Sequence, residues 1–310
     1  MEFIATLAAK LSKSEPEVVS FLASAPLKYK VYTIPKRTSG HRVIAQPSRE
    51  LKEYQRTFLS IYKLKIHSAA MAYREGLSIK DNAQAHCKNR YLLKIDLKNF
   101  FNSISNELFW NVWQQHYTLP AKREKVLMER LLFWSPSKSS KGKLILSIGA
   151  PSSPLISNFF MYQFDELVTQ QCETLNITYT RYADDLTFST NEKDILFDIP
   201  KAVTEFLTLL FGNSMIINRR KTVFSSMAHN RHITGITINN KSELSLGRER
   251  KRYIKHLVHH YQTKQIDQET ILQLKGLLAF SSHIEPDFIK RLEAKYSSAV
   301  ISQIFEEQNG

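Results

Sequence analysis

Three aspartates carry the chemistry that this sequence suggests, and two of them are adjacent. Asp184 and Asp185 follow Tyr182 and Ala183 in the stretch 179–189, where β-prone residues lead into and out of the pair. This pattern predicts a β-hairpin with the two aspartates at its tip. Side chains at neighbouring positions of a regular strand point to opposite faces, whereas at a tight turn both can reach one volume. Because two facing carboxylates repel each other, we expect a cation between them.

The third aspartate, Asp96, lies within the apolar stretch 91–97, which predicts a buried strand. A buried charge is costly without a partner, so Asp96 either pairs with Lys94 or Lys98 or binds a metal ion. If this strand lies beside the hairpin, the three carboxylates could hold two divalent ions about 3.5–4 Å apart. Such ions activate a hydroxyl group and stabilise a leaving pyrophosphate, which is the chemistry of nucleotidyl transfer. An Asp-Asp pair alone is more often an ordinary acidic turn.

Composition points to a polyanionic partner. The chain has 310 residues, a formal net charge of +14 and 43% hydrophobic residues, with a pI near 9.6. A basic excess of this size favours binding to nucleic acid or to a membrane surface. No signal peptide or membrane-crossing apolar run is apparent, so we expect a cytoplasmic protein that binds nucleic acid and no membrane. Its two cysteines, Cys87 and Cys172, exclude a disulfide framework and a cysteine-based zinc site.

Several patterns predict the elements around the aspartates. Expected helices cover about 1–24, 48–66, 106–116, 121–133, 154–173 and 199–211, and expected strands cover 29–37, 41–45 and 144–148. The stretches 231–238 and 244–246 suggest a further hairpin. A turn at 38–40 joins the first two strands, and Gly149 with two prolines ends the strand 144–148. From Gly247 the composition changes, and three helices are expected at about 248–263, 268–281 and 286–306. We therefore predict an N-terminal helical segment 1–27, a main domain 28–246 and a helical domain 247–310.

The order of these features resembles that of reverse transcriptases. Tyr182-Ala183-Asp184-Asp185 resembles the signature box of that family, and the stretch Leu92-Leu-Lys-Ile-Asp-Leu-Lys-Asn-Phe-Phe101 resembles the box with the first catalytic aspartate. Further similar boxes are Arg42-Val-Ile-Ala-Gln-Pro-Ser-Arg-Glu-Leu51, Gly149-Ala-Pro-Ser-Ser-Pro154 and Asn218-Arg-Arg-Lys-Thr222. Asn82-Ala-Gln-Ala-His86 resembles an element typical of retron reverse transcriptases, and Ile233-Thr-Gly235 stands where retrons usually have Val-Thr-Gly. The resemblance covers roughly residues 28–310.

The resemblance implies an α+β fold of the right-hand polymerase type, with fingers and palm to residue 246 followed by an α-helical thumb. It also implies that Asp96, Asp184 and Asp185 are catalytic. Asp96 and Asp184 would bind two Mg²⁺ ions, with Asp185 in support and the Leu97 carbonyl as a further ligand.

The resemblance also implies a nucleotide site. Lys36 and Arg42 would hold the triphosphate, and backbone groups at Gly149 and Ala150 would contact the nucleotide. Phe101 matches the aromatic residue that rejects a ribose 2′-OH, although it could instead pack beside Phe100. Lys221 would neutralise or protonate the leaving pyrophosphate, unless it is a solvated lysine. Many family members have Gln where this chain has Ile148.

Nucleic-acid contacts are expected from three places. Arg49 would anchor the fingers or the template, and Asn82 and His86 belong to the retron element. The first helix after Gly247 carries basic residues that would follow the phosphates of the duplex and of the partner RNA, namely Arg248, Arg250, Lys251, Arg252 and Lys255. The alternative is a solvated basic face. His259 and His260 lack companion ligands, so no metal site is expected there.

We therefore expect an RNA-directed DNA polymerase that uses Mg²⁺ and dNTPs. Resemblance to retrons implies that the template and primer are the element's own structured RNA, with priming from an internal guanosine 2′-OH. It further implies a branched RNA–DNA product (msDNA) and an accessory effector protein in anti-phage defence. The alternatives are a reverse transcriptase of the group II intron or diversity-generating type, a two-metal nuclease, and a catalytically idle RNA-binding scaffold.

Overall fold

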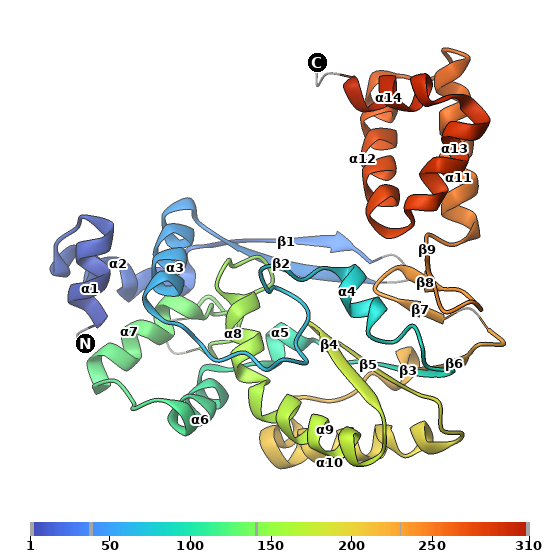
Figure 1. Cartoon of the computed structure of the whole chain (residues 1–310). Helices are drawn as coiled ribbons and strands as arrows, with labels where there is room; N and C mark the ends of the chain where they lie inside the picture. Colours follow the sequence, from blue (N-terminus) through green and yellow to red (C-terminus); the bar gives the residue numbers. More distant parts are fainter. Residues whose placement is uncertain (1–2, 37–39, 140–141, 230, 308–310) are drawn as a thin grey trace. The chain divides into compact units, whose positions relative to one another are not determined.

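The computed structural model describes residues 3–36, 40–139, 142–229 and 231–307 (Figure 1). The chain forms two compact units, each assembled from several segments. The first comprises residues 1–75, 94–187 and 194–223, and the second comprises 76–93, 188–193 and 224–310. Residues 224–246 thus group with the C-terminal helices, whereas the sequence placed them with the preceding domain. The predicted division into an N-terminal segment, a fingers and palm domain and a thumb, with boundaries at 27 and 246, stays a prediction.

The first unit opens with helices α1 (Phe3–Leu11) and α2 (Glu15–Ser24), where one helical segment was expected. The two separate at Ser12, whose φ of 54° is left-handed. Ser14 and Glu17 form a capping box that starts α2. Helix α3 (Arg49–Ile61) begins after the Ser48 cap, and α7 (Lys122–Leu132) completes this group of helices. The contacts of α1 with α3 and of α2 with α7 hold the group together.

Strands β1 (Tyr29–Pro35) and β2 (His41–Pro47) form the predicted hairpin, with antiparallel register from Tyr29 opposite Pro47 to Pro35 opposite His41. The expected turn at Thr38 and Ser39 lies outside the described residues. Ala45 of β2 donates its N–H to the carbonyl of Ile148 at 3.1 Å, which holds the segment before Gly149 against the hairpin. The prediction of a strand at 144–148 is wrong, because this segment forms only isolated bridges, from Ile145 to Ser105 and to Trp134.

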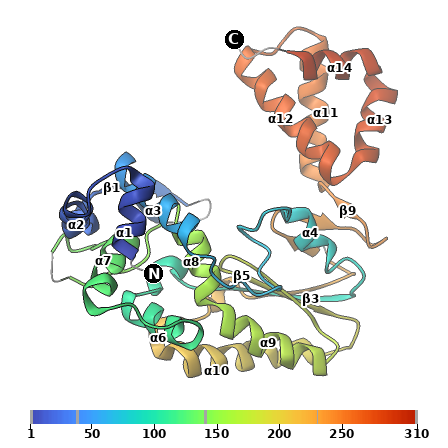
Figure 2. The ribbon, with the colours of Figure 1, turned by 60° about the vertical axis from the view of Figure 1, so that its left-hand side comes forward.

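A four-stranded sheet carries the aspartates. Its order is β4 (Thr178–Tyr182), β5 (Asp185–Thr190), β3 (Tyr91–Asp96) and β6 (Val223–Ser226). Helices α8 (Ser153–Phe160) and α9 (Tyr162–Thr174) replace the single helix expected at 154–173, because the chain breaks at Met161. Helix α9 contacts β4, and α10 (Ile199–Phe211) lies beside α9, as Figures 1 and 2 both show. Short helices α5 (Phe100–Ser103) and α6 (Asn106–His116) follow β3.

The second unit joins a small sheet to a helical bundle. Helix α4 (Ile79–Gln84) packs on the antiparallel strands β7 (Arg231–Ile233), β8 (Ile236–Ile238) and β9 (Leu244–Ser245). The bundle contains α11 (Arg248–Gln262), α12 (Gln268–Ile284), α13 (Pro286–Tyr296) and α14 (Ser298–Glu306), seen in Figure 2. The last expected helix is split at Ser297, whose φ is 79° and whose hydroxyl caps α14.

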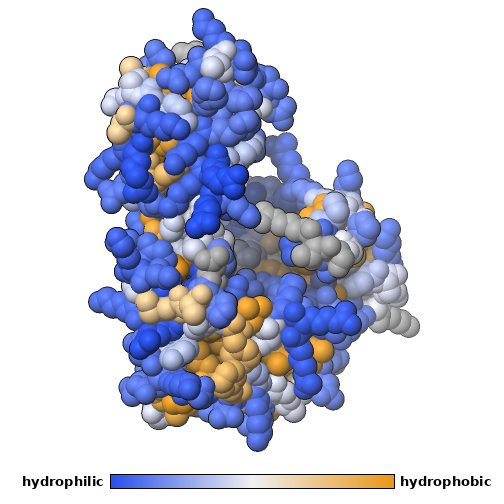
Figure 3. Space-filling model, turned by 90° about the vertical axis from the view of Figure 1, so that its right-hand side faces the viewer, coloured by the Kyte–Doolittle hydropathy of each residue, from blue (hydrophilic) through white to orange (hydrophobic). Residues whose placement is uncertain are grey.

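One apolar core runs through this second unit and includes Leu257, Leu274, Leu278, Phe288 and Ile304. The face of the bundle that is seen at the top of Figure 3 is mostly hydrophilic. Among the described residues, no helix is both long and apolar enough to cross a bilayer. Short 3₁₀ helices also occur, at Ala25–Leu27, Ile195–Phe197, Gly212–Ser214 and Arg219–Lys221.

Candidate active site

The turn between β4 and β5 brings two of the aspartates next to the third. Strand β4 ends at Tyr182, Ala183 has a left-handed φ of 59°, and β5 begins at Asp185. The predicted hairpin tip at the Asp pair is confirmed. The N–H of Leu97 donates to the carbonyl of Asp184 at 2.9 Å, and Leu97 directly follows Asp96 at the end of β3. The backbone itself therefore joins the turn to the strand that carries the third carboxylate.

Asp96 has polar partners on both of its carboxylate oxygens. Lys221 Nζ lies 2.8 Å from Oδ2, and Asn218 Nδ2 lies 2.9 Å from Oδ1. The N–H of Asn218 also donates to the carbonyl of Asp96, at 2.7 Å. A salt bridge was one expectation for Asp96, but its partner is Lys221 rather than Lys94 or Lys98. The Lys221 side chain is 60% exposed and the Asp96 side chain 11%, so the lysine can leave this pair for another anion at small cost.

The carboxylates influence one another. Loss of hydration, followed by the charge of Asp96, raises the pKa of Asp184 above its ordinary value. Loss of hydration, followed by the charges of Asp184 and Asp96, raises the pKa of Asp185 to about 6. The hydrogen bond to Asp96 and the charges of all three aspartates raise the pKa of Lys221. The site therefore has an excess of negative charge that a cation would relieve.

The donor chemistry fits a divalent cation, because three carboxylates supply the hard oxygen ligands that such ions prefer. In their present positions, however, no three His, Cys, Asp or Glu side chains of the described residues are grouped closely enough to hold a metal ion. Asp96 is engaged by Lys221 and Asn218, and Asp185 is exposed at the start of β5. The contribution of the Leu97 carbonyl stays a prediction.

A cavity of about 330 Å³ in the first unit is lined by three of the predicted nucleotide-site residues, Phe101, Gly149 and Ala150. Gly149 has a φ of 121°, and a Cβ there would come within 3.3 Å of the Ala45 carbonyl, so glycine is required for this close approach. Phe101 is half-buried and contacts Phe100 edge-on at 5.3 Å between ring centroids. Both expectations for Phe101, lining a site and packing on Phe100, are thus compatible.

The sequence did not single out three other residues that line this cavity, Lys52, Arg56 and Tyr73. Burial, followed by the charge of Asp184, raises the pKa of Tyr73, which places this ring near the β4–β5 turn. Lys52 and Arg56 stand four residues apart on α3 and therefore share one helix face. That spacing of two basic residues, beside the predicted Arg49, was the available signal. Ile148 also lines the cavity, and its aliphatic side chain has no polar group to offer a nucleotide.

The basic residues of the β1–β2 hairpin differ in their relation to the aspartates. Arg42 is close enough to Asp184 and Tyr73 for its positive charge to act on both. It lowers the pKa of each group, whereas burial and nearby negative charges raise it. Lys36 is exposed just beyond β1, and its backbone N–H donates to the Gly40 carbonyl at 2.9 Å. Arg49 is exposed at the first position of α3.

Asn82 and His86, which the sequence assigned to nucleic-acid binding, have no exposed surface in the second unit. His86 Nδ1 lies 2.7 Å from Ser189 Oγ, and Asn89 Nδ2 donates to the same oxygen at 2.7 Å. Burial lowers the pKa of His86 to about 3, so the ring is neutral near pH 7. The expected direct contact with nucleic acid is therefore not possible in this arrangement, because both side chains are enclosed.

The basic residues of α11 fall into two groups. Arg248, Arg252 and Lys255 are exposed, whereas Arg250 and Lys251 have partners within the unit. Arg250 donates to the Gly235 carbonyl at 3.3 Å and lies over the Phe280 ring. Lys251 forms an ion pair with Glu285 at 2.7 Å, and Arg291 forms a second at 2.6 Å on the same carboxylate oxygen.

Comparison with known proteins decides the family. Residues 34–238 match the family model described as reverse transcriptase (RNA-dependent DNA polymerase). The chain is 46% identical over 303 residues to the retron Ec83 reverse transcriptase of Escherichia coli, with 97% of each chain covered. It is also 32% identical over 289 residues to the retron Ec73 reverse transcriptase of the same species, with 88% of each covered.

The chain belongs to the retron reverse transcriptases. It is therefore an RNA-directed DNA polymerase, and the predicted right-hand polymerase class, with mixed helix and sheet, is that of its family. Enzymes of this family use divalent metal ions, in keeping with the carboxylate site. The assignment replaces the alternatives of an intron-type or diversity-generating enzyme, a nuclease and an idle scaffold.

Solved structures similar to this retron reverse transcriptase include two polymerases of other kinds. One is the telomerase of Candida albicans in complex with a fragment of telomeric RNA, with a TM-score of 0.47, 14% identity and coverage of 91% of this chain and 61% of that one. The other is a foamy viral protease-reverse transcriptase in complex with double-stranded DNA, with a TM-score of 0.45, 15% identity and coverage of 91% and 44%.

Proposed function

We propose that this retron reverse transcriptase copies part of its own structured non-coding RNA into single-stranded DNA. Synthesis would start from an internal guanosine 2′-OH of that RNA, so that the product is a branched RNA–DNA molecule (msDNA). The observation that supports the polymerase chemistry is the junction of β3 with the β4–β5 turn, where Leu97 N donates to Asp184 O and Asp96 adjoins Lys221. The own-RNA template and the priming step rest on the relationship to retron enzymes. The family relationship supports RNA as the template, and the net charge of +14 favours a nucleic-acid partner.

Asp96 and Asp184 would hold two Mg²⁺ ions, with Asp185 and the Leu97 carbonyl in support. Such ions lower the pKa of an attacking hydroxyl group and neutralise charge on a leaving pyrophosphate. The chain's own contribution would be to hold the backbone of these residues at neighbouring strands of one sheet.

Lys221 would act on the leaving group. Its ammonium already rests on Asp96, and its side chain is largely exposed. If Asp96 held a metal ion, the ammonium would be free to donate a hydrogen bond or a proton to a pyrophosphate oxygen.

The cavity beside the turn would hold the incoming dNTP and the base that templates it. Phe101 would stand where the sugar lies and reject a 2′-OH, while Lys36 and Arg42 hold the triphosphate. Gly149 and Ala150, which line this cavity, would contact the nucleotide through their backbone groups. Ile148 would offer only an apolar contact, so base pairing with the template carries the selection. Lys52 and Arg56 would bind phosphates of the template strand.

Helix α11 would contact the nucleic-acid backbone through Arg248, Arg252 and Lys255, with Arg49 as a further contact from α3. Arg250 and Lys251 would fix the helix within its unit through Gly235 and Glu285. Asn82 and His86 would serve the RNA indirectly, by shaping the surface over α4. The retron relationship extends the proposal to an accessory effector protein and a role in anti-phage defence in the cytoplasm.

The test is expression of the protein together with its upstream RNA, followed by extraction of small nucleic acids. We expect a short, discrete single-stranded DNA that keeps an RNA branch under denaturing conditions until RNase or a debranching enzyme removes it. Asp184→Ala should abolish this DNA, whereas Glu205→Ala, which removes an exposed carboxylate from α10, should not. Persistence of the DNA in Asp184→Ala would refute the site, and an unbranched product would refute the priming step.

A further inference from the structure

The catalytic turn adopts a backbone conformation that its sequence does not favour. Ala183, with a φ of 59°, is in the left-handed region, which residues other than glycine seldom adopt. It is also buried, with 6% of its surface exposed. Such a conformation persists only where the surroundings over-determine it. The turn that carries Asp184 and Asp185 must therefore be held from outside.

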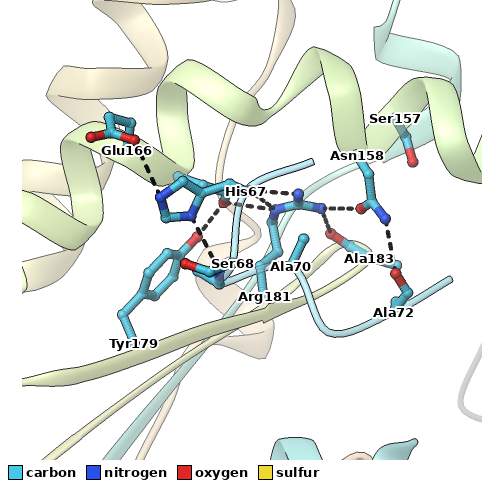
Figure 4. A network of polar contacts seen from close by, with 12 residues as sticks. His67, Ser68, Ala70, Ala72, Ser157, Asn158, Glu166, Tyr179, Arg181 and Ala183 are labelled. Atoms are coloured by element: carbon cyan, nitrogen blue, oxygen red, sulfur yellow. Dashed lines mark hydrogen bonds and ion pairs between the residues drawn. The ribbon is translucent and has the colours of Figure 1, made fainter. Parts of the chain in front are cut away.

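A buried arginine lies directly beneath this turn. Arg181, two residues before Ala183, has no exposed surface, and its Nη1 donates to the Ala183 carbonyl at 3.2 Å (Figure 4). The same nitrogen donates to Asn158 Oδ1 at 3.2 Å. A guanidinium can make several bonds in a fixed plane, so the position of the Ala183 carbonyl is tied to that of the Asn158 amide.

The guanidinium is itself held by a buried carboxylate. Arg181 Nη2 lies 2.6 Å from Asp165 Oδ2, and Nε lies 2.8 Å from Oδ1. Asp165 has no exposed surface and also accepts from the Tyr179 hydroxyl at 2.8 Å. Because Asp165 belongs to α9, this pair fixes the arginine to a long helix rather than to a loop.

Further contacts fix the other members of this network. Asn158, on α8, donates from Nδ2 to the Ala72 carbonyl at 2.8 Å. The N–H of Arg181 donates to the Ala69 carbonyl at 2.8 Å, and the N–H of Met71 donates to the Arg181 carbonyl at 2.8 Å. The turn is thus connected to two helices and to the segment 69–72, all within the first unit.

A buried ion pair is weak evidence for stability, since apolar residues of similar volume often stabilise a core as well. What apolar residues could not supply is the donor to the Ala183 carbonyl. We propose that Arg181 is a positioning residue, which holds the Ala183 carbonyl from its anchor on Asp165 and Asn158 and so sets where Asp184 and Asp185 meet Asp96. The inference rests on the proposed metal-binding role of these aspartates.

Two variants test the role of the guanidinium. Arg181→Lys keeps the positive charge beside Asp165 but loses the planar donor that joins Asn158 to Ala183. Asn158→Ala leaves the ion pair intact and removes the amide that orients the guanidinium. For both we expect a kcat lower by about 10- to 100-fold, the usual effect of removing a residue that orients metal ligands. The KM for dNTP and the affinity for the RNA should stay at the parent values.

A second readout does not depend on activity. Binding of Mn²⁺ to the free protein, followed by electron paramagnetic resonance of the unbound ion, should weaken by about 10- to 100-fold in both variants. Arg231→Lys is the matched control, because Arg231 is 1% exposed and donates to the carbonyls of Asn89 and Asn239 in the second unit. It should lower the melting temperature without changing kcat or Mn²⁺ affinity at temperatures where the protein is folded.

The result that overturns the inference is a folded Arg181→Lys or Asn158→Ala protein with the parent kcat and the parent Mn²⁺ affinity. If Arg181→Lys does not fold, Asn158→Ala decides. Asp184→Asn separates this failure from that of the proposed site. If Asp184→Asn is inactive while Arg181→Lys is fully active, only the positioning role is refuted. If Asp184→Asn is active, the proposed site is refuted, and the inference with it.

Discussion

Lys221 Nζ lies 2.8 Å from Asp96 Oδ2, so the residue proposed to act on the leaving pyrophosphate is also the counter-ion of a proposed metal ligand. Asp96 ends β3, whereas Lys221 closes the short helix Arg219–Lys221. The proposal for Lys221 requires the ammonium to leave Asp96 for a phosphate oxygen of the leaving group. Because the lysine side chain is largely exposed, its pairing with Asp96 contributes little to folding, about 0–1 kcal/mol.

Lys221→Ala should therefore reduce catalysis with little effect on stability. We expect the rate of single-nucleotide incorporation to fall by roughly 100-fold, as is typical when a general acid is removed. The melting temperature should change little. Arg220→Ala, which removes the exposed cation next to it, is the control and should leave the rate near that of the parent. A Lys221→Ala enzyme with the parent rate in single-turnover experiments would show that the lysine is only a counter-ion.

Phe101→Ala should relax sugar selection. Phe101 lines the cavity in the first unit, and its ring centroid lies 6.5 Å from that of Tyr73. Removing the ring would open space for a 2′-OH, so the kcat/KM for a ribonucleotide relative to that for the matching deoxyribonucleotide should rise by roughly 100-fold. Phe101→Tyr, which keeps the ring, should retain the parent selectivity. If Phe101→Ala lowers stability but leaves selectivity unchanged, the ring serves only to pack against Phe100.

Much of the site could be predicted because its information is local. The β-prone residues around Asp184 and the apolar run around Asp96 each specify a strand, and the structure places these strands side by side. The breaks at Met161 and Ser297 could not be predicted. Ser297 adopts a positive φ that its residue type does not favour, and Met161 interrupts a continuous helical pattern. Tertiary packing decides both.

Long-range polar partners were the other source of error. The sequence suggested that His86 faces nucleic acid, yet it is enclosed with Ser189, which is 103 positions away in the chain. From the sequence, Arg181 is one more basic residue beside a turn. Its role depends on its partner Asp165 on α9. Asp165 is the acidic residue on a helix face that is otherwise apolar, formed by Phe164, Val168 and Cys172. An acid within an apolar helix face, followed by an arginine within an apolar strand, is the signal that could have revealed this pair.

The stability of the second unit should fall in mild acid because of His86. Its folded pKa is about 3, below the ordinary value of 6.5. Above pH 6.5 neither the folded nor the unfolded state binds this proton, and the stability is complete. As the pH falls from 6.5 towards 3, the unfolded state binds the proton but the folded state does not. The free energy of unfolding therefore decreases by at most about 1.4 kcal/mol per pH unit.

Denaturant unfolding at pH 6.5 and pH 5 checks this expectation. The free energy of unfolding of the parent should decrease by about 2 kcal/mol more than that of His86→Gln, which has no imidazole to titrate. His283→Gln is the control, since His283 is an exposed histidine on α12 and should behave like the parent. Equal pH dependence in the parent and in His86→Gln would contradict the burial of a neutral ring.

The two groups of basic residues on α11 should differ in their effect on RNA binding. Arg252→Ala and Lys255→Ala each remove an exposed charge, so each should lower the magnitude of the slope of log K against log salt by about 1. Lys251→Ala should instead leave Glu285 with fewer partners, and its main effect should be a lower melting temperature. Lys290→Ala on α13, which removes an exposed lysine paired with Asp287, is the control for loss of charge alone.

Filter binding of the cognate RNA over a salt series gives the slopes. If Lys290→Ala changes the slope as much as Arg252→Ala does, RNA binding reflects the general charge of the bundle rather than this face of α11.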